Sequence, residues 1–179
     1  MKTGIRAEMR KRRRAVSAEV RAVASRGLCA RLLEHEAVVA AIAAKRPIMV
    51  YFATPDEPDL SEFVTAALER GAVLAAPRWN GVTYEPTLFR SLAELGEGPH
   101  GITEPIECSP AANVAVWLVP GLAFTANGRR LGHGGGWYDR LLSGAEADAV
   151  RLGVGYDFQV VGDLPQEPHD QLLDEIITA

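Results

Sequence analysis

Residues 47–77, PIMVYFATPDEPDLSEFVTAALERGAVLAAP, contain two short apolar runs on either side of an amphipathic segment. The runs at 47–53 and 72–76 have the length and apolar character of buried strands, and Pro77 should end the second one. Between them, residues 60–70 have helical periodicity, and Gly71 is placed to end that helix. Strand, helix and strand in this order form a βαβ unit, which predicts a parallel sheet covered by helices.

Further segments extend this alternation along the chain. We expect helices at 2–15, 18–34 and 137–143, strands at 82–90, 114–119, 152–156 and 176–177, and a Gly-, Pro- and Glu-rich connection at 91–112. Ser17 should cap the second helix, whose expected apolar face comprises Val20, Val23, Ala24, Leu28 and Leu32. No repeat, low-complexity tract or linker interrupts the chain, so we predict a single α/β domain over residues 1–179.

The composition is that of an ordinary globular protein, with 47% hydrophobic and 23% charged residues. The two cysteines, Cys29 and Cys108, form no C-x-x-C pair, so the sequence indicates neither a disulfide framework nor a thiolate metal site. This usage favours a reducing compartment, and we expect a cytoplasmic protein. The sequence has no run of the roughly 18 apolar residues that a membrane span needs, so we expect no membrane partner.

Positive charge is concentrated near the N-terminus. Residues 1–46 hold 12 of the 19 Lys and Arg but only four Glu, so they are net +8 and the remainder is net −12. Within a basic helical arm at 1–16, three cations recur every four positions and share one helical face: Lys2, Arg6 and Arg10. Three interpretations stay open: a solvated basic face, a transit peptide, which the nearby Glu residues disfavour, and an arm that binds phosphate.

Residues 118–142, LVPGLAFTANGRRLGHGGGWYDRLL, form a second informative stretch. Four of the five residues at 132–136 are glycine, although each glycine costs conformational entropy and buries no side chain. Such a run lets backbone N–H groups approach a ligand closely, just ahead of a helix N-terminus, and this favours an anion such as phosphate. Arg130 can neutralise phosphate oxygens, and Asp139 can hold the Mg²⁺ that accompanies a nucleotide.

The glycine spacing excludes the two common phosphate motifs. A Walker A loop has Lys after its glycines and a dinucleotide-binding turn has G-x-G-x-x-G, whereas this chain has GHGGG. A glycine-rich surface turn therefore stays open as an alternative. Two polar groups, Asp56 to Asp59 after a predicted strand and His169, Asp170 and Asp174 near the end of the sequence, are either ligand sites or solvated loops.

Several of these motifs, taken in order, resemble the signature of the 5-formyltetrahydrofolate cyclo-ligase family, also called methenyltetrahydrofolate synthetases. The likeness extends over most of the chain. Its main part comprises Pro120-Gly121-Leu122-Ala123-Phe124 and then Gly128-x-Arg130-Leu131-Gly132-x-Gly134-Gly135-Gly136-Trp137-Tyr138-Asp139-Arg140. Further matching segments are Lys2-x-x-x-Arg6, Ser17-Ala18-Glu19, Glu57-Pro58-Asp59, Gly101-Ile102-Thr103-Glu104-Pro105 and His169-Asp170.

The resemblance implies a three-layer α/β/α fold with a mostly parallel central sheet, similar to the class that includes ribose-5-phosphate isomerase and CoA-transferase relatives. It also implies an enzyme that uses ATP and Mg²⁺ to convert 5-formyltetrahydrofolate into 5,10-methenyltetrahydrofolate, with release of ADP and phosphate. We accordingly expect small-molecule partners, no nucleic-acid partner, and a monomer.

Residue roles follow from the resemblance motif by motif. ATP would contact Lys2, Arg6, Arg130, Leu131, Gly132, His133, Gly134, Gly135, Gly136, Trp137 and Tyr138, of which Arg130 and Tyr138 would be catalytic. The folate would contact Glu57, His133, Gly134, Gly135, Gly136 and Trp137. Magnesium would be held by Asp139 and Asp170.

Three positions depart from the family pattern: Trp137 where Tyr is usual, His133 where Arg or Tyr is usual, and His100 where an aromatic residue is usual. None removes a phosphate or metal ligand, so they bear on substrate specificity. A divergent enzyme for another formyl or amide substrate and a non-catalytic nucleotide- or folate-binding module stay open. RNA binding is disfavoured, because residues 1–46 contain no aromatic residue for stacking and the rest is acidic.

Overall fold

A six-stranded sheet forms the centre of the computed structural model, which describes residues 2–179. Its strand order is β10-β9-β6-β1-β2-β3, and every neighbouring pair is parallel except β2 and β3. The bounds are β1 Pro47–Met49, β2 Val73–Trp79, β3 Tyr84–Phe89, β6 Val116–Pro120, β9 Val150–Gly155 and β10 Glu175–Thr178. The mostly parallel sheet predicted from the βαβ unit is confirmed.

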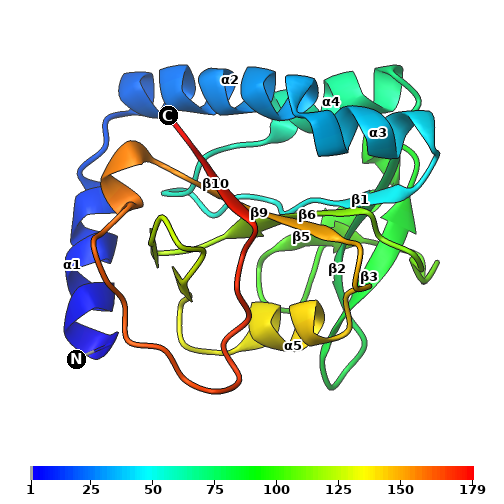
Figure 1. Ribbon diagram of the computed structural model, residues 1–179. Coiled ribbons are helices and arrows are strands. Elements are labelled where there is room, and N and C mark those ends of the chain that lie inside the picture. The colour runs from blue at the N-terminus through cyan, green and yellow to red at the C-terminus, as the bar shows by residue number, and fades with distance from the viewer. Residues whose placement is uncertain (1) are drawn as a thin grey trace.

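Helices cover both faces of this sheet, as Figure 1 shows. One face carries α2 (Ala18–Glu34), α3 (Glu36–Ala43) and α4 (Ser61–Glu69), and the other carries the short α5 (Trp137–Ser143). The first helix, α1 (Lys2–Arg14), stands across one end of the layers. The expected three-layer α/β/α architecture is therefore confirmed, with α1 outside the three layers.

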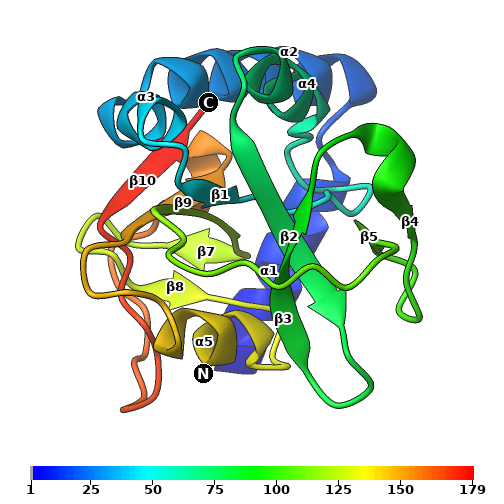
Figure 2. The ribbon, with the colours of Figure 1, turned by 90° about the vertical axis from the view of Figure 1, so that its right-hand side faces the viewer.

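Two small sheets and two short 3₁₀ turns complete the chain. The expected connection at 91–112 contains the turn η1 (Leu92–Glu94) and the antiparallel pair β4 (Leu95–Glu97) and β5 (Thr103–Pro105), which lies beside β2 and β3 (Figure 2). A second antiparallel pair, β7 (Ala123–Phe124) and β8 (Arg130–Leu131), follows β6, and the turn η2 (Asp157–Gln159) follows β9. The sequence patterns indicated none of these short elements.

The βαβ unit differs from its prediction at both strands. The strand β1 ends at Met49, although Val50 N still donates to Ala75 O at 2.8 Å. The strand β2 continues through Pro77 to Trp79, so the expected stop is wrong. Proline is tolerated because this part of β2 extends beyond β1 and pairs on its other side with β3, where Pro77 faces Pro86.

The second helix begins and ends where the sequence predicts. The Ser17 side chain accepts a hydrogen bond from Val20 N at 3.3 Å, which confirms the N-cap. Two members of the expected apolar face are wrong, because Val20 and Val23 are 59% and 62% exposed. The buried stripe of α2 is rotated away from Val23 and comprises Ala24, Ser25, Leu28, Cys29 and Leu32.

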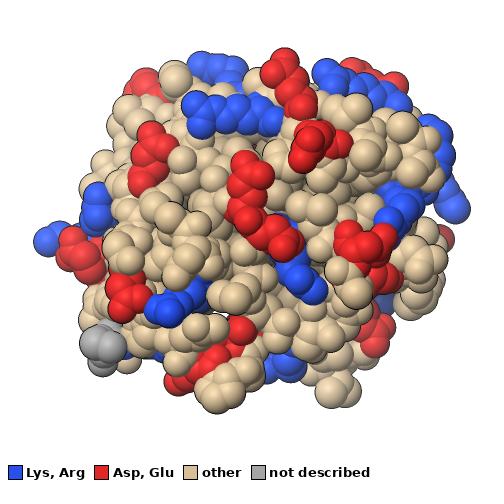
Figure 3. All heavy atoms as spheres, viewed as in Figure 1, with Lys and Arg blue, Asp and Glu red and all other residues tan. Residues whose placement is uncertain are grey.

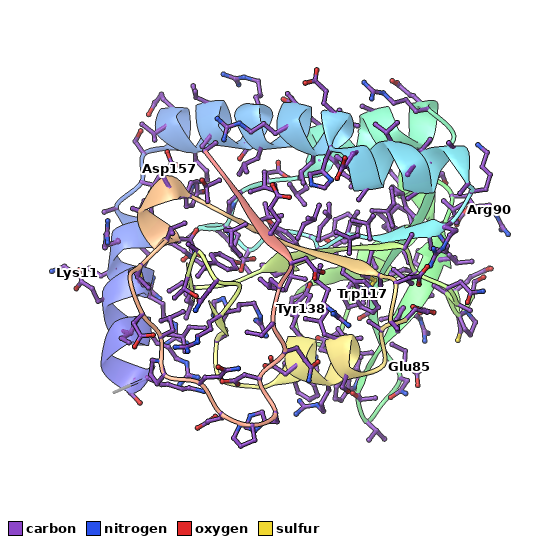
Figure 4. All side chains as sticks on the ribbon, in the orientation of Figure 1. Lys11, Glu85, Arg90, Trp117, Tyr138 and Asp157 are labelled. Atoms are coloured by element: carbon purple, nitrogen blue, oxygen red, sulfur yellow. The ribbon has the colours of Figure 1, made fainter. Side chains whose placement is uncertain are left out.

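The central strand β6 separates the two halves of the core. Leu118 packs into the cluster that contains residues of α2, α3 and α4, whereas Trp117 and Val119 pack with Leu141 and Leu142 of α5. Figure 4 shows Trp117 between the sheet and α5. Burial on both faces is typical of an inner parallel strand. Within residues 2–179, no helix combines the length and apolarity that crossing a membrane would demand.

Candidate active site

The carboxyl ends of β1 and β6 lie side by side, because these two strands pair in parallel. The chain after β1 forms the acidic loop that contains Glu57, and the chain after β6 leads to residues 132–136, called here the glycine loop. Ligands of open parallel sheets bind at this edge, outside the strand ends. A cavity of about 350 Å³ lies there, a volume suited to a small-molecule ligand.

The cavity brings together every site residue expected from the sequence. Its walls include Lys2, Arg6, Glu57, Arg130, Leu131, Gly132, His133, Gly134, Gly135, Gly136, Trp137, Tyr138, Asp139 and Asp170. These residues come from four segments that are far apart in the chain. Figure 1 shows three of them, namely α1, the chain before α5 and the segment leading to β10, on the same side of the sheet.

The basic arm lies against the glycine loop. Arg6 Nε donates to the backbone oxygen of Gly132 at 2.9 Å, and Arg10 Nη2 donates to that of His133 at 3.0 Å. Met9, on the same side of α1, is buried in a cluster with Leu131. The interpretation as a purely solvated basic face is therefore wrong for this side, whereas Lys11 on the other side points away from the body (Figure 4).

The glycine loop has both conformational and spatial reasons for its composition. Gly134 and Gly136 have φ of +113° and +65°, values that side chains other than that of glycine rarely adopt. At Gly132 and Gly135, an added Cβ would lie 2.8 Å from Arg130 Nη1 and 2.6 Å from Trp137 Nε1. The loop thus combines an unusual backbone with close packing of two functional side chains, which an ordinary surface turn does not require.

Arg130 and Asp139 form an ion pair in the cavity wall. Arg130 Nη2 lies 3.0 Å from Asp139 Oδ2, and the side chains are 4% and 17% exposed. The guanidinium also lies over the ring of Tyr138, 5.6 Å from its centroid. Arg130 Nε is buried and has no hydrogen-bond partner among the described residues. A confined cation in the cavity wall is suited to an anionic ligand.

Tyr138 lies between α5 and the sheet, as Figure 4 shows. Burial raises the pKa of its hydroxyl far above the ordinary value, and the nearby charge of Glu57 acts in the same direction. The phenol therefore stays protonated at neutral pH and is able to donate a hydrogen bond.

Lys2 connects α1 to the segment before β10, which forms another part of the cavity wall. Its Nζ lies 2.9 Å from both Glu167 Oε2 and Asp170 Oδ2. Partial burial acts to lower the pKa of Lys2, but the hydrogen bonds to the two carboxylates outweigh it, so the pKa lies above its ordinary value. Burial acts to raise the pKa of Asp170, but hydrogen bonds from Lys2 and from Glu167 N outweigh it, so this pKa is lowered.

The same carboxylates belong to a candidate cation site. Ligand atoms of Glu167, His169 and Asp170 all lie within 4.8 Å of one another. Sequence reasoning missed Glu167, since an isolated exposed Glu has no distinguishing pattern. Asp174 accepts a hydrogen bond from Arg151 N at 2.7 Å and so serves the local backbone.

Glu57 is the member of the acidic loop that reaches the cavity. Its side chain is 6% exposed and accepts a hydrogen bond from Thr54 N at 3.0 Å, while Arg13 Nη1 and His133 Nε2 each lie 3.4 Å from Oε1. Burial acts to raise the pKa of Glu57, but the hydrogen bonds from His133 and Thr54 and the charge of Arg13 hold it below its ordinary value. Glu57 is therefore a carboxylate at neutral pH.

An aromatic cluster surrounds Trp137, and of its members Trp137 and Tyr84 line the cavity. The Trp137 ring lies 5.2 Å from that of Trp79 and 5.5 Å from that of Tyr84. His100 packs edge-on against Trp79 at 4.9 Å, and its Nδ1 lies 2.8 Å from the Tyr84 hydroxyl. Two of the three departures from the family pattern, Trp137 and His100, thus share the same neighbours. Sequence reasoning missed Trp79 and Tyr84, which the hairpin of β2 and β3 supplies.

Charges outside the cavity are mixed. On the face shown in Figure 3, Lys and Arg are interspersed with Asp and Glu rather than gathered into one basic surface. Arg129, next to Arg130 in sequence, pairs with the exposed Asp163 at 2.6 Å. The cations of the cavity wall are therefore not part of a larger basic surface.

Comparisons with known proteins show the family to which the chain is related. A family model described as the 5-formyltetrahydrofolate cyclo-ligase family matches residues 1–179. The chain is 32% identical over 147 residues to the 5-formyltetrahydrofolate cyclo-ligase of Mycolicibacterium smegmatis, covering 74% of this chain and 73% of the relative. It is 25% identical over 191 residues to the enzyme of that name from Mus musculus, covering 98% and 92%. The NMR structure of Aquifex aeolicus 5,10-methenyltetrahydrofolate synthetase is similar with a TM-score of 0.86 and 31% identity, covering 99% of this chain and 89% of that one.

Proposed function

The chain belongs to the 5-formyltetrahydrofolate cyclo-ligase family, and we propose that its cavity performs the ATP-dependent conversion of 5-formyltetrahydrofolate into 5,10-methenyltetrahydrofolate. One observation carries the proposal to individual residues. The four segments with family motifs, from α1, the acidic loop, the glycine loop and the segment before β10, line a single cavity. Convergence of distant motifs on one cavity is expected of an active site and is not required by packing.

The reaction explains why ATP is needed. The formyl group of the substrate is part of an amide, so its oxygen is a poor leaving group. Transfer of the γ-phosphoryl of ATP to this oxygen yields ADP and a good leaving group. The neighbouring folate amine then attacks the formyl carbon and loses its proton, the ring closes, and the oxygen departs as phosphate. The protein contributes mainly by positioning and by neutralising charge, as in other phosphoryl transfers.

On the nucleotide side, we assign phosphate contacts to Lys2, Arg6 and Arg130 and to backbone N–H groups of residues 131–138. Arg130 supports this role best, because it lines the cavity and is confined and positively charged. Tyr138 contributes a protonated hydroxyl. Arg130 and Tyr138 are accordingly the proposed catalytic residues, acting on the charge that develops on the transferred phosphoryl group.

The metal would be held by Asp139 and Asp170. Carboxylate oxygens are suitable ligands for Mg²⁺. Lys2 Nζ lies between Asp170 and Glu167, which supports the proposal that the carboxylates near Asp170 accommodate a cation. When bound, Mg²⁺ would neutralise charge on the phosphates. Both aspartates pair with proposed phosphate-binding cations, Lys2 and Arg130, so binding of Mg-ATP would exchange internal ion pairs for pairs with the ligand.

On the folate side, we assign Glu57, His133, Trp137 and the backbone of residues 134–136. The Glu57 carboxylate can accept paired N–H bonds from the polar edge of the pterin. Trp137 and the neighbouring Tyr84 offer aromatic surface to the flat parts of the folate. Because His100 joins this cluster, its departure from the family pattern affects the support of Trp137 and Tyr84 rather than the phosphate region.

We further propose that residues 1–179 act as one domain and as a cytoplasmic monomer. The assigned groups all come from one chain, and Cys29 and Cys108 are free thiols, which suits a reducing compartment. Light scattering of the purified protein tests the monomer assignment, since a stable dimer mass would contradict it.

The activity is tested by mixing the purified protein with 5-formyltetrahydrofolate and Mg-ATP. We expect the ultraviolet absorbance of the methenyl product to appear together with one ADP per product. Consumption of ATP only with another formylated or amide substrate would instead indicate a divergent enzyme. Nucleotide binding without turnover of any folate would indicate a binding module.

A further inference from the structure

Arg13, in the last turn of α1, is almost completely buried, although the sequence groups it with exposed basic residues. Its Nε and Nη2 donate to the two carboxylate oxygens of Asp56 at 3.1 and 2.9 Å. Its Nη1 donates to Glu57 Oε1 at 3.4 Å and to the backbone oxygen of Gly121 at 3.3 Å. A guanidinium can bind these three partners at once because its five N–H donors lie in one plane and point in different directions.

These contacts connect the two sides of the cavity. The face of α1 that carries Lys2 and Arg6 lies on the nucleotide side, whereas the guanidinium of Arg13 lies behind Glu57 on the folate side. The Gly121 oxygen belongs to the turn through which β6 leads toward the glycine loop. Arg13 itself is not among the described residues that line the cavity, so any effect on ligands passes through its partners.

The position of Glu57 depends on this arrangement. Its carboxylate is nearly buried, and an ionised carboxylate at such a place requires charged or hydrogen-bonding partners. Arg13 is the cation among the three groups that contact it, beside Thr54 N and His133. Asp56 holds the same guanidinium at two oxygens and fixes its direction.

We propose that Arg13 is a positioning residue that couples nucleotide binding to folate binding. A phosphate ligand that fixes Lys2 and Arg6 also fixes the helix to which Arg13 belongs, and the Arg13 guanidinium then holds Glu57 ready for the folate. Coupling of this kind is reciprocal, so folate must strengthen nucleotide binding by the same factor. The inference rests on the proposed function, in which α1 contacts ATP and Glu57 contacts folate.

The test compares the dissociation constant of 5-formyltetrahydrofolate with and without a saturating non-hydrolysable Mg-ATP analogue. For the unaltered protein, we expect the analogue to tighten folate binding by about fivefold or more, the lower range of measured couplings. Arg13→Lys keeps the charge but loses the planar fork of N–H donors. The ratio of the folate dissociation constants without and with the analogue should therefore fall to about one. Affinity for the analogue alone should stay close to the original value. Arg14→Lys, the same change at an exposed position of α1, should keep the original ratio.

Each outcome decides the proposal. The coupling role is overturned if a folded Arg13→Lys protein shows the same ratio of folate dissociation constants as the unaltered protein. It is also overturned if that ratio is about one in the unaltered protein. If Arg13→Lys does not show a cooperative thermal transition, Asp56→Asn decides instead, because it leaves Arg13 in place but removes its anchor. That variant should also lose coupling, and an unchanged ratio would contradict the proposal. Absence of folate binding and turnover in the unaltered protein would refute the proposed function itself.

Discussion

Replacing Arg130 with Met is expected to weaken ATP binding by about 10- to 100-fold with little change in folate affinity. The guanidinium is 4% exposed, so solvent screens its charge weakly. A hydrogen bond to a charged group contributes about 1.5–3 kcal/mol, and each 1.4 kcal/mol corresponds to a factor of ten in affinity. Met retains much of the length and volume of the side chain, which limits the change to the loss of charge and donors.

The substitution also leaves Asp139 without its cation. Because Asp139 is 17% exposed and still accepts a hydrogen bond from Gln171 N, we expect the free energy of unfolding to fall by about 1–3 kcal/mol. Adding Asp139→Asn to Arg130→Met should recover part of this stability, since the unpaired charge is removed, but should not recover ATP affinity. The two effects of Arg130 are thereby separated.

Calorimetric titration with ATP and with 5-formyltetrahydrofolate measures both affinities, and urea denaturation measures stability. Arg129→Met is the matched control, because Arg129 pairs at the surface with an Asp163 side chain that is 82% exposed. This control should change the free energy of unfolding by less than about 1 kcal/mol and leave ATP affinity unchanged. An equal loss of ATP and folate affinity in Arg130→Met, or no loss of either, would refute the phosphate assignment.

Four further predictions concern other parts of the site. Glu57→Gln should weaken folate binding about tenfold or more and leave ATP affinity close to its original value; the reverse pattern in titrations would contradict the assignment. Gly136→Ala should lower the free energy of unfolding by about 1–2 kcal/mol, because its φ is +65°, and an unchanged melting temperature would contradict this. The pKa values of Asp56 and Glu57 are lower in the folded protein than in the unfolded chain, where they are about 4. The two carboxylates therefore stabilise the folded protein at pH values above about 4, and this contribution is lost as the pH falls through their folded pKa values. Urea denaturation between about pH 6 and pH 3 should show this decline, with a shallower slope for Glu57→Gln. Chelation of Mg²⁺ should weaken ATP binding more in the unaltered protein than in Asp139→Asn with Asp170→Asn, and equal effects would contradict the metal assignment.

The features predictable from the sequence are those that local chemistry determines. Ser17 caps α2 through a hydrogen bond from Val20 N, and Gly71 adopts a φ of +75° just after Arg70, the C-cap of α4. The parallel sheet is also predictable from neighbouring segments. A strand, a helix and a strand that follow one another closely can bury the apolar face of each element in few arrangements, and a βαβ unit is the common one. Pro77 was misinterpreted because its tolerance depends on β3, which pairs with β2 beyond the end of β1.

Residues of the candidate site were predictable where they belong to a motif and not where their position depends on distant partners. The glycine loop and Glu57 lie in continuous signatures, whereas Arg13 is one of five consecutive basic residues at 10–14. Its burial depends on Asp56, 43 positions further along the chain. Tyr84 likewise joins the cavity, and Trp79 packs against Trp137, only because β2 and β3 form a hairpin that extends beyond β1. No periodicity within a segment carries such information.

The charge pairing in the cavity provides a physical reason for the proposed use of a metal-bound nucleotide. Lys2 pairs with Asp170 and Arg130 pairs with Asp139, so the cations are already neutralised by carboxylates. A bare phosphate that recruited both cations would leave two partly buried carboxylates unpaired, which is strongly unfavourable. A phosphate accompanied by a divalent cation supplies a partner for each group, because the cations turn to the phosphate and the carboxylates to the metal. The arrangement therefore discriminates against free anions by the cost of broken ion pairs, and it favours a ligand that carries both signs of charge.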